Sequence, residues 1–482
     1  MDTPFVTLPG SEEYRQWQRS VSACCATAHD WFDAHPCTHR FGEAYAYLRE
    51  VEATLGFFAL SQLCPPGFFH KLIRQIDTRQ ASAPARNADA EPHEPWEEAE
   101  WPLLAVLIRT ALGRRRDCLF CPAHLPDPAA LRARLAAFAD MPLLDRDLAT
   151  HLLLDKLADH AVSRGKSLPQ PIVPRWLARL MIRLAAVAPG ETVCDPSMGY
   201  GNLLAETALT LPVAERLRCS GQGGDSPLGI LLPYLSGVVA LTSDPLADLP
   251  PERGMPDYAA SFSLADRVLC GSPDPGQDVA ISAGTAARDD AMHIVYRHLN
   301  ELDLDNGRAV LLAHMRLLFR EDEDAARRSD LVSRNLLDAV ILLPGNIMLG
   351  DTTARALLLF DRRRKAGGVR QAEEDIFMLD LSGWGRRSGM QVQLDAGELE
   401  KIAAYRERRE EVPGISRRVP RAEVLRHNVW LPARYLVQAA PSSSEGIRRL
   451  AGRRAAIEND LHAVESRVDA LLDKLAAMRH LA

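Results

Sequence analysis

A short glycine-containing loop follows a predicted strand near residue 195. The strand begins at 191 and ends in Asp195-Pro196, and Gly199 and Gly201 follow before the next apolar stretch. Doubly wound sheets bind their ligands beyond the carboxyl ends of the strands, and glycine lets the backbone approach a ligand closely. These residues predict a binding loop that fits S-adenosylmethionine, which has no pyrophosphate. A purely structural turn is the alternative interpretation.

Cysteine and histidine side chains form a second candidate for chemistry. Cys118, Cys121 and His124 have the spacing of half a zinc site, and the other half would come from the distant segment 35–39. Zinc sites are usually built from two close pairs, so we expect free thiols and no metal. Nine cysteines in a chain of 482 residues also do not indicate a disulfide framework.

Clusters of basic side chains are candidates for contacts with phosphates. They lie at 114–116, 362–365, 386–387 and 417–418. Most charge runs are solvated surface, so only clusters beside a cleft are expected to contact a ligand. The formal net charge of −7 excludes a general basic field that would attract nucleic acid.

The elements that must position these residues alternate along the chain. An amphipathic helix precedes the glycine loop, and apolar runs then alternate with helical patterns, which is typical of βαβ units and a parallel sheet. Strands are expected at 191–194, 217–222, 238–242, 267–270, 308–313, 337–343, 354–360 and 375–381. Helices are expected at 202–211, 226–235, 288–304, 322–336 and 396–410.

The two ends of the chain have other patterns. Residues 1–165 show helical periodicity, interrupted by an acidic linker at about 79–100. At 445–480, apolar residues recur every three or four positions with Arg454 as the only interruption, which predicts a coiled-coil helix within 445–482. The alternative is a long helix packed on its own domain.

The chain is expected to be a cytoplasmic protein. Its first ten residues lack a basic and then apolar signal pattern. The longest apolar run, 227–241, is short and contains prolines and glycines, so we expect no membrane span.

The central segment resembles the adenine-methylating M subunit of type I restriction–modification enzymes. The family pattern is T-P-R, a helix, and then D-P-x-x-G-x-G. Here Pro174-Arg175, with Val173 in place of the threonine, is followed by Asp195, Pro196, Gly199 and Gly201. Further similar segments follow in the family's order: GQGGDSP at 221–227, SDPL at 243–246, DRVLCGSPDPG at 266–276, AVILLPGNIM at 339–348 and NVWLPARYL at 428–436.

This resemblance implies a fold and a domain organisation. The expected fold is α/β, with a class I S-adenosylmethionine-dependent methyltransferase-like (Rossmann-like) domain. That domain is expected at 166–395, after the helical N-terminal domain at 1–165. A helical connector is expected at 396–444, followed by the coiled coil at 445–482.

The acceptor motif departs from the family. The family's Asn-Pro-Pro-Phe accepts hydrogen bonds from the base's exocyclic amine and stacks an aromatic ring on the flipped base. Here the motif is Gly271-Ser272-Pro273-Asp274, in which Gly271 has no acceptor side chain and Asp274 cannot stack. A register shifted by one gives Ser272-Pro273-Asp274-Pro275, which also lacks the aromatic residue. We therefore expect catalysis to be absent or weakened, unless Phe262 or Tyr258 replaces the stacking ring.

The residues that the resemblance assigns to the cofactor are better retained. Pro174, Asp195, Pro196, Gly199 and Gly201 match the pattern, and Asp244 matches the family's acid near the adenine of the cofactor, although a helix cap is the alternative for that aspartate. Gly223 stands where the family has the acid that holds the ribose, and Asp225 is the nearest substitute. We expect S-adenosylmethionine binding to be weak or lost.

The resulting hypothesis is an M-subunit-like protein of a restriction or phage-defence complex with a structural or DNA-clamping role. An active N6-adenine methyltransferase with an unusual acceptor loop and a pure protein-interaction scaffold are the alternatives. The expected partners are a specificity-type subunit, a second copy bound through 445–480, or both, and DNA.

Overall fold

A nine-stranded sheet organises the part of the chain that the computed structural model describes. The described residues are 12–34, 54–64, 66–82, 128–164, 172–188, 191–195, 199–222, 228–238, 240–242, 267–270, 299, 306–321, 323–348, 354–389 and 391–436. The predicted coiled coil at 445–482, residues 83–100 of the predicted linker and the helix at 288–304, apart from residue 299, lie outside them. Residues 79–82, expected as the start of the linker, are instead the last residues of a helix.

The strand order places β1 (Val193–Asp195) at a reversal of the chain's direction across the sheet. Its neighbours are β2 (Cys219–Gln222) and β4 (Arg267–Cys270), both parallel to it. The complete order is β11-β8-β6-β7-β5-β4-β1-β2-β3, in which β3 is Ala240–Thr242 and β5 is Arg308–His314. This is the 3-2-1-4-5 order of doubly wound sheets, as the predicted class I methyltransferase-like fold requires.

The sheet is mixed, which corrects the expectation of a parallel one. β7 (Arg355–Asp361) runs antiparallel to both β5 and β6 (Leu337–Leu342), whereas β8 (Asp375–Asp380) is parallel to β6. The described part of the connection between β6 and β7, residues 343–348, contains no helix and includes Pro344 and Gly345. The chain therefore turns back at this point instead of crossing over.

Residues 396–436 are not an all-helical connector, and that expectation is wrong for 416–420. α12 (Ala396–Arg408) begins at the capping box of Asp395 and Glu398, but β11 (Ser416–Pro420) then pairs antiparallel with β8 and α13 (Arg421–His427) follows. This segment thus completes the edge of the sheet.

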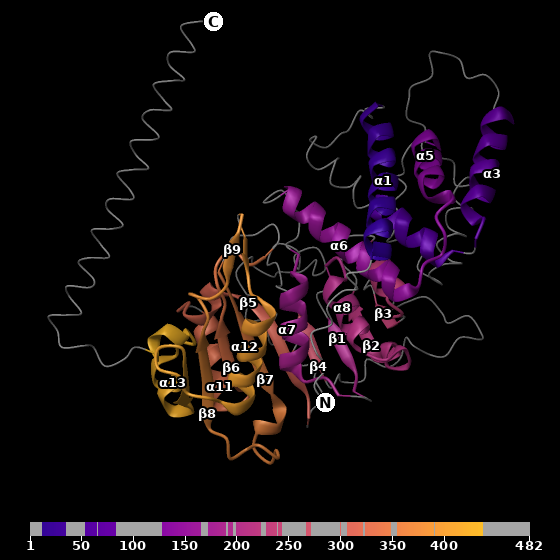
Figure 1. Ribbon diagram of the computed structural model, residues 1–482. Coiled ribbons are helices and arrows are strands. Elements are labelled where there is room, and N and C mark those ends of the chain that lie inside the picture. The colour runs from indigo at the N-terminus through magenta and orange to yellow at the C-terminus, as the bar shows by residue number, and fades with distance from the viewer. Residues whose placement is uncertain are drawn as a thin grey trace, which may run out of the picture.

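Alternate residues of the central strands pack on opposite faces of the sheet. Val310 and Leu312 of β5 join a core that includes α7 (Arg175–Ala185) and α12, whereas Leu311 joins a second core with α11 (Glu323–Ser333). α8 (Asn202–Thr210) and α9 (Leu228–Leu235) also belong to the first core. Figure 1 shows this layered arrangement.

All secondary structure described before residue 165 is helical. α1 (Glu12–Ala34), α3 (Phe68–Ser82) and α5 (Pro128–Ala139) lie together beside α6 (Arg146–Arg164), and a further helical stretch covers 54–63 (Figure 1). α6 also contacts α8 and α9, so these helices pack directly on the α/β part. Within the described ranges, no helix is long and apolar enough to cross a membrane.

Candidate functional site

The reversal at β1 gives the sheet one edge suited to ligand binding. β1, β2 and β4 are adjacent and parallel, so their last residues, Asp195, Gln222 and Cys270, lie at the same edge. From β1 the chain adds β2 and then β3 on one side, and β4 returns to the other side of β1. Doubly wound sheets bind their ligands at such a reversal, beyond the carboxyl ends of the strands. Asp195 is buried there, with 1% of its surface exposed.

The glycine loop after β1 leads directly into α8. Gly199 and Gly201 have φ values of 53° and 76°, in the left-handed region that favours glycine. A Cβ atom on Gly201 would lie 2.6 Å from Cδ of Pro233 and 3.1 Å from the carbonyl oxygen of Gly229, both in α9. Gly201 is therefore required by the packing of α8 on α9, a reason that the sequence pattern did not indicate.

The segment around Pro174 lies beside this loop. The Nδ2 of Asn202, the first residue of α8, donates a hydrogen bond of 2.8 Å to the carbonyl oxygen of Val173. Both residues are buried. The structure thus brings together two predicted parts of the cofactor site, Pro174 and the loop 199–201, through a residue that the sequence analysis missed.

Arg175 anchors the same region through ion pairs between helices. Its guanidinium contacts Asp155 of α6 at 2.6 Å and also pairs with Glu206 of α8. Glu206 accepts a second contact from Arg179, and Asp155 accepts hydrogen bonds from Tyr14 and Gln18 of α1. The arginine of the family's T-P-R motif therefore connects α1 and α6 to the helices that flank β1.

The directions in which the pKa values of Arg175 and His151 are shifted agree with a tightly paired cluster. Burial disfavours the charged form of Arg175, but the carboxylates of Glu206 and Asp155 outweigh it and raise the pKa of this arginine. Burial and the adjacent Arg175 lower the pKa of His151, so this histidine is neutral at pH 7. The cluster holds its charges by pairing and has a structural role.

The remaining predicted site residues are not among those the structure describes. They are Pro196, Asp225 and Asp244 of the cofactor set and Ser272, Pro273 and Asp274 of the acceptor motif. The same holds for Gly223, Gly271 and the Cys118 group. Within the described ranges, no three His, Cys, Asp or Glu side chains are grouped to hold a metal.

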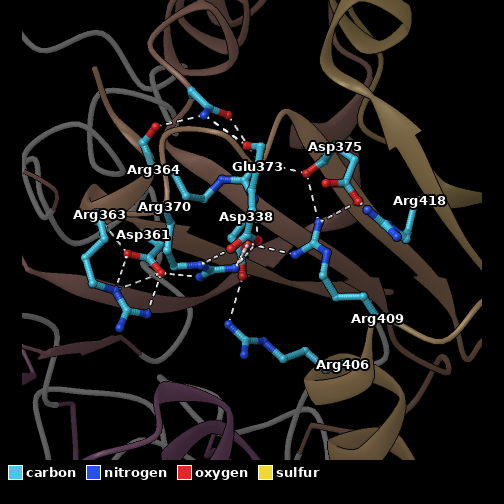
Figure 2. A network of polar contacts seen from close by, with 11 residues as sticks. Asp338, Asp361, Arg363, Arg364, Arg370, Glu373, Asp375, Arg406, Arg409 and Arg418 are labelled. Atoms are coloured by element: carbon cyan, nitrogen blue, oxygen red, sulfur yellow. Dashed lines mark hydrogen bonds and ion pairs between the residues drawn. The ribbon is translucent and has the colours of Figure 1, made fainter. Parts of the chain in front are cut away.

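Arg363 and Arg364 of the basic run 362–365 belong to a network of ion pairs at the opposite, amino edge of the sheet. Asp338, at the start of β6, contacts the guanidinium groups of Arg364, Arg406 and Arg409 at 2.8–2.9 Å and that of Arg370 at 3.3 Å (Figure 2). Burial alone would raise the pKa of Asp338, but these four arginines lower it to about 2. Arg364 is fully buried and thus cannot contact an external phosphate.

The other two described basic clusters differ from each other. Arg417 pairs with Glu423 at 3.3 Å and Arg418 with Asp375, so both are engaged within the fold. Arg386 and Arg387 are exposed and make no ion pair with any other described residue.

Three solved structures with the same fold come from type I restriction–modification systems. The type I restriction–modification methyltransferase subunit of Streptococcus thermophilus is 15% identical, covers 87% of this chain and 99% of its own, and has a TM-score of 0.55. The modification subunit of a putative type I restriction enzyme from Vibrio vulnificus is 14% identical, with coverage of 88% and 94% and a TM-score of 0.55. A chain from a type I restriction–modification complex is 17% identical, with coverage of 95% and 99% and a TM-score of 0.54.

A family comparison points in the same direction. Residues 277–444 match the N-6 DNA methylase family, whereas no curated protein matches the chain. The chain therefore has the methyltransferase-like fold of type I modification subunits and resembles them, with a segment at 277–444 that matches the N-6 DNA methylases.

Proposed function

We propose that this chain is the M-subunit-like component of a cytoplasmic type I restriction–modification or phage-defence complex, in which adenine methylation is weakened or lost. The observation that carries the proposal is the edge of the sheet at β1, where Asp195 and the left-handed loop 199–201 lie at the reversal of strand order. In this role the chain clamps DNA or supports the assembly, and a specificity-type subunit selects the target.

S-adenosylmethionine is the cofactor that this edge would hold. The loop 199–201 and Asp195 stand at the carboxyl end of β1, and Asn202 holds the Pro174 segment against them. When bound, the cofactor supplies the methyl group. Gly223 cannot accept hydrogen bonds from the ribose as an acidic residue does, so binding is expected to be weak.

The acceptor motif is the reason to propose impaired transfer. An exocyclic amine needs acceptors that localise its lone pair, and a flipped base needs an aromatic surface. The motif at 271–274 reads Gly-Ser-Pro-Asp, so both the Asn acceptor and the aromatic ring are absent from their usual positions.

Tritium transfer from S-adenosylmethionine to unmethylated duplex DNA tests the proposal. The full chain is incubated with a specificity-type subunit of a type I system, and methylated adenine is measured after digestion. We expect no methylation above background, together with weak cofactor binding in calorimetry. Site-specific methylation by the natural chain would overturn the impairment and support an active enzyme with an unusual loop.

A repaired chain provides the matched control. The triple substitution Gly271→Asn, Ser272→Pro and Asp274→Phe restores the family's Asn-Pro-Pro-Phe. Methylation by this variant alone would assign the defect to the acceptor motif. If neither chain binds the cofactor or DNA, the proposal fails and a pure protein scaffold is the better description.

A further inference from the structure

A small β-hairpin projects from the carboxyl edge of the sheet. β9 (Arg386–Ser388) and β10 (Gln391–Gln393) pair antiparallel, and the hairpin follows β8 after a short turn (Figure 1). β8 is parallel to β6 and so runs in the same direction as β5, β4 and β1. The hairpin therefore lies at the same edge as Asp195 and the predicted cofactor loop.

The base of the hairpin is fixed to the domain. The backbone amide of Val392 donates a 2.9 Å hydrogen bond to the carbonyl oxygen of Asn346, and the backbone amide of Gly385 donates one of 3.1 Å to the carboxylate of Glu398 in α12.

Side-chain packing also fixes the entry to the hairpin. The ring of Trp384 packs edge to face on that of Tyr405, with ring centroids 6.2 Å apart. At Gly385, whose φ is 83°, a Cβ would lie 2.7 Å from Cγ1 of Val392. The entry to the hairpin is therefore held in one geometry.

One face of the hairpin turns inward and the other turns toward solvent. Val392 packs against the core on the inner face, and residues directly opposite each other across an antiparallel pair share a face. In the strand register, Arg386 lies opposite Gln393 and Ser388 lies opposite Gln391. The side chains of these four residues therefore make up the outer face. Arg387 lies on the inner face but is exposed near the tip.

These residue types match one class of ligand. Arginine, serine and glutamine are among the side chains that contact DNA phosphates and sugars, and a two-stranded ribbon fits the width of the major groove. Arg386 and Arg387 have no ionic partner among the described residues, in contrast to Arg364 or Arg418, which are paired within the fold.

We propose that the hairpin 384–393 contacts the phosphate backbone of duplex DNA through Arg386 and Arg387. Arg386 contacts it from the outer face, with Ser388, Gln391 and Gln393 beside it, and Arg387 from the other face, close to the tip. This inference rests on the proposed function, because it assumes that the carboxyl edge faces DNA. Four strand spacings separate β8 from β4, which is about 19 Å at about 4.8 Å per strand. That span corresponds to about 5–6 base pairs of duplex, so the hairpin contacts DNA away from the base at the acceptor loop.

Fluorescence anisotropy of a labelled, unmethylated duplex over a range of salt concentrations tests the proposal. The full chain is compared with the double variant Arg386→Gln/Arg387→Gln. Each lost phosphate contact lowers the slope of log K against log salt by about 0.9, so a slope about 1.8 smaller is expected. Restoring the charge with Arg386→Lys/Arg387→Lys should return most of the slope.

The control is Arg408→Gln/Arg426→Gln, which removes the same charge from two exposed arginines on α12 and α13. Its slope should equal that of the natural chain. An equal slope in the hairpin variant would overturn the inference, favour an acidic protein surface as the ligand of the hairpin, and leave the proposed function standing. Failure of the natural chain to bind duplex at all would overturn both the inference and the DNA-binding part of the proposed function.

Discussion

Arg175 and Glu206 form a buried ion pair that joins the helix before β1 to the helix after it. The side chain of Glu206 is 2% exposed, and Arg179 gives it a second contact at 3.3 Å. Because Arg175 also binds Asp155 in α6, one connected set of charges links the N-terminal helices to the flanks of the glycine loop. The position of that loop therefore depends on residues outside it.

Replacement of Glu206 with glutamine should destabilise the fold strongly. It leaves Arg175 and Arg179 without their shared carboxylate in a buried setting, which costs about 3 kcal/mol. Urea unfolding monitored by circular dichroism measures the loss. Glu12→Gln is the matched control, because Glu12 also contacts two arginines but is exposed in α1. Its expected cost is below about 1 kcal/mol, and similar losses in both variants would contradict the interpretation.

Asp338 should make stability depend on acid pH. Its pKa in the folded chain is about 2, below the ordinary 3.8, so its stabilising contribution is present above about pH 4 and is lost as the pH falls toward 2. The shift corresponds to about 2 kcal/mol. The difference in free energy of unfolding between the natural chain and Asp338→Asn should stay constant from pH 6 to about pH 4 and narrow below it. A difference that persists unchanged at pH 3 would exclude this assignment.

Gly201→Ala should be destabilising for two separable reasons. A left-handed non-glycine residue costs about 1–2 kcal/mol, and the new Cβ overlaps Pro233, whose Cδ lies 2.6 Å away, which adds about 1–3 kcal/mol. In a Pro233→Ala background the second cost should largely disappear. A double-mutant cycle by urea unfolding is expected to give a coupling of at least about 1 kcal/mol. Additive effects would mean that the helices move apart freely at this contact.

Restoring an acid at position 223 should strengthen cofactor binding. A carboxylate that accepts hydrogen bonds from the ribose contributes about 1.5–3 kcal/mol, or about ten- to hundredfold in affinity. Calorimetric titration of Gly223→Glu with S-adenosylmethionine measures the gain, and Gly223→Gln controls for side-chain size. No heat in either titration would argue against a retained cofactor site.

Removal of 445–482 should abolish assembly while the α/β part stays folded. A helix over 445–480 would be about 50 Å long, and its apolar stripe requires a partner. Size-exclusion chromatography with light scattering compares the full and shortened chains, alone and with the specificity-type subunit. Equal assembly of both chains would show that the interface lies elsewhere.

The alternating pattern of apolar runs was sufficient to predict most of the central sheet. β4 was predicted at 267–270, where it occurs, and β5, β6 and β8 were each predicted to within one residue. Buried strands are continuous apolar runs, so their positions are visible in the sequence. β11 was missed because it is an edge strand with the sequence SRRVP, whose arginines and proline are typical of strands that pair on one side only.

The candidate site could be predicted only where local sequence determines it. Asp195, Gly199 and Gly201 follow from a strand, a turn and a helix in succession. The packing of Gly201 on Pro233 and the bond from Asn202 to Val173 depend on contacts between segments about 30 residues apart in the sequence. The buried state of Arg364 likewise depends on its ion pair with Asp338 in β6, so no pattern within 362–365 indicates it.

The arginine cluster around Asp338 lies at one edge of the sheet, and the predicted cofactor and acceptor loops follow the strands at the other. The six residues of β6 span about 20 Å between these edges. Substitutions in the acceptor loop are therefore expected to leave unchanged the ion pairs of Asp338 and Asp375 that connect β6 and β8 to the end of α12. Changes of activity at Gly271 and Asp274 are therefore expected to be independent of the stability of the folded domain.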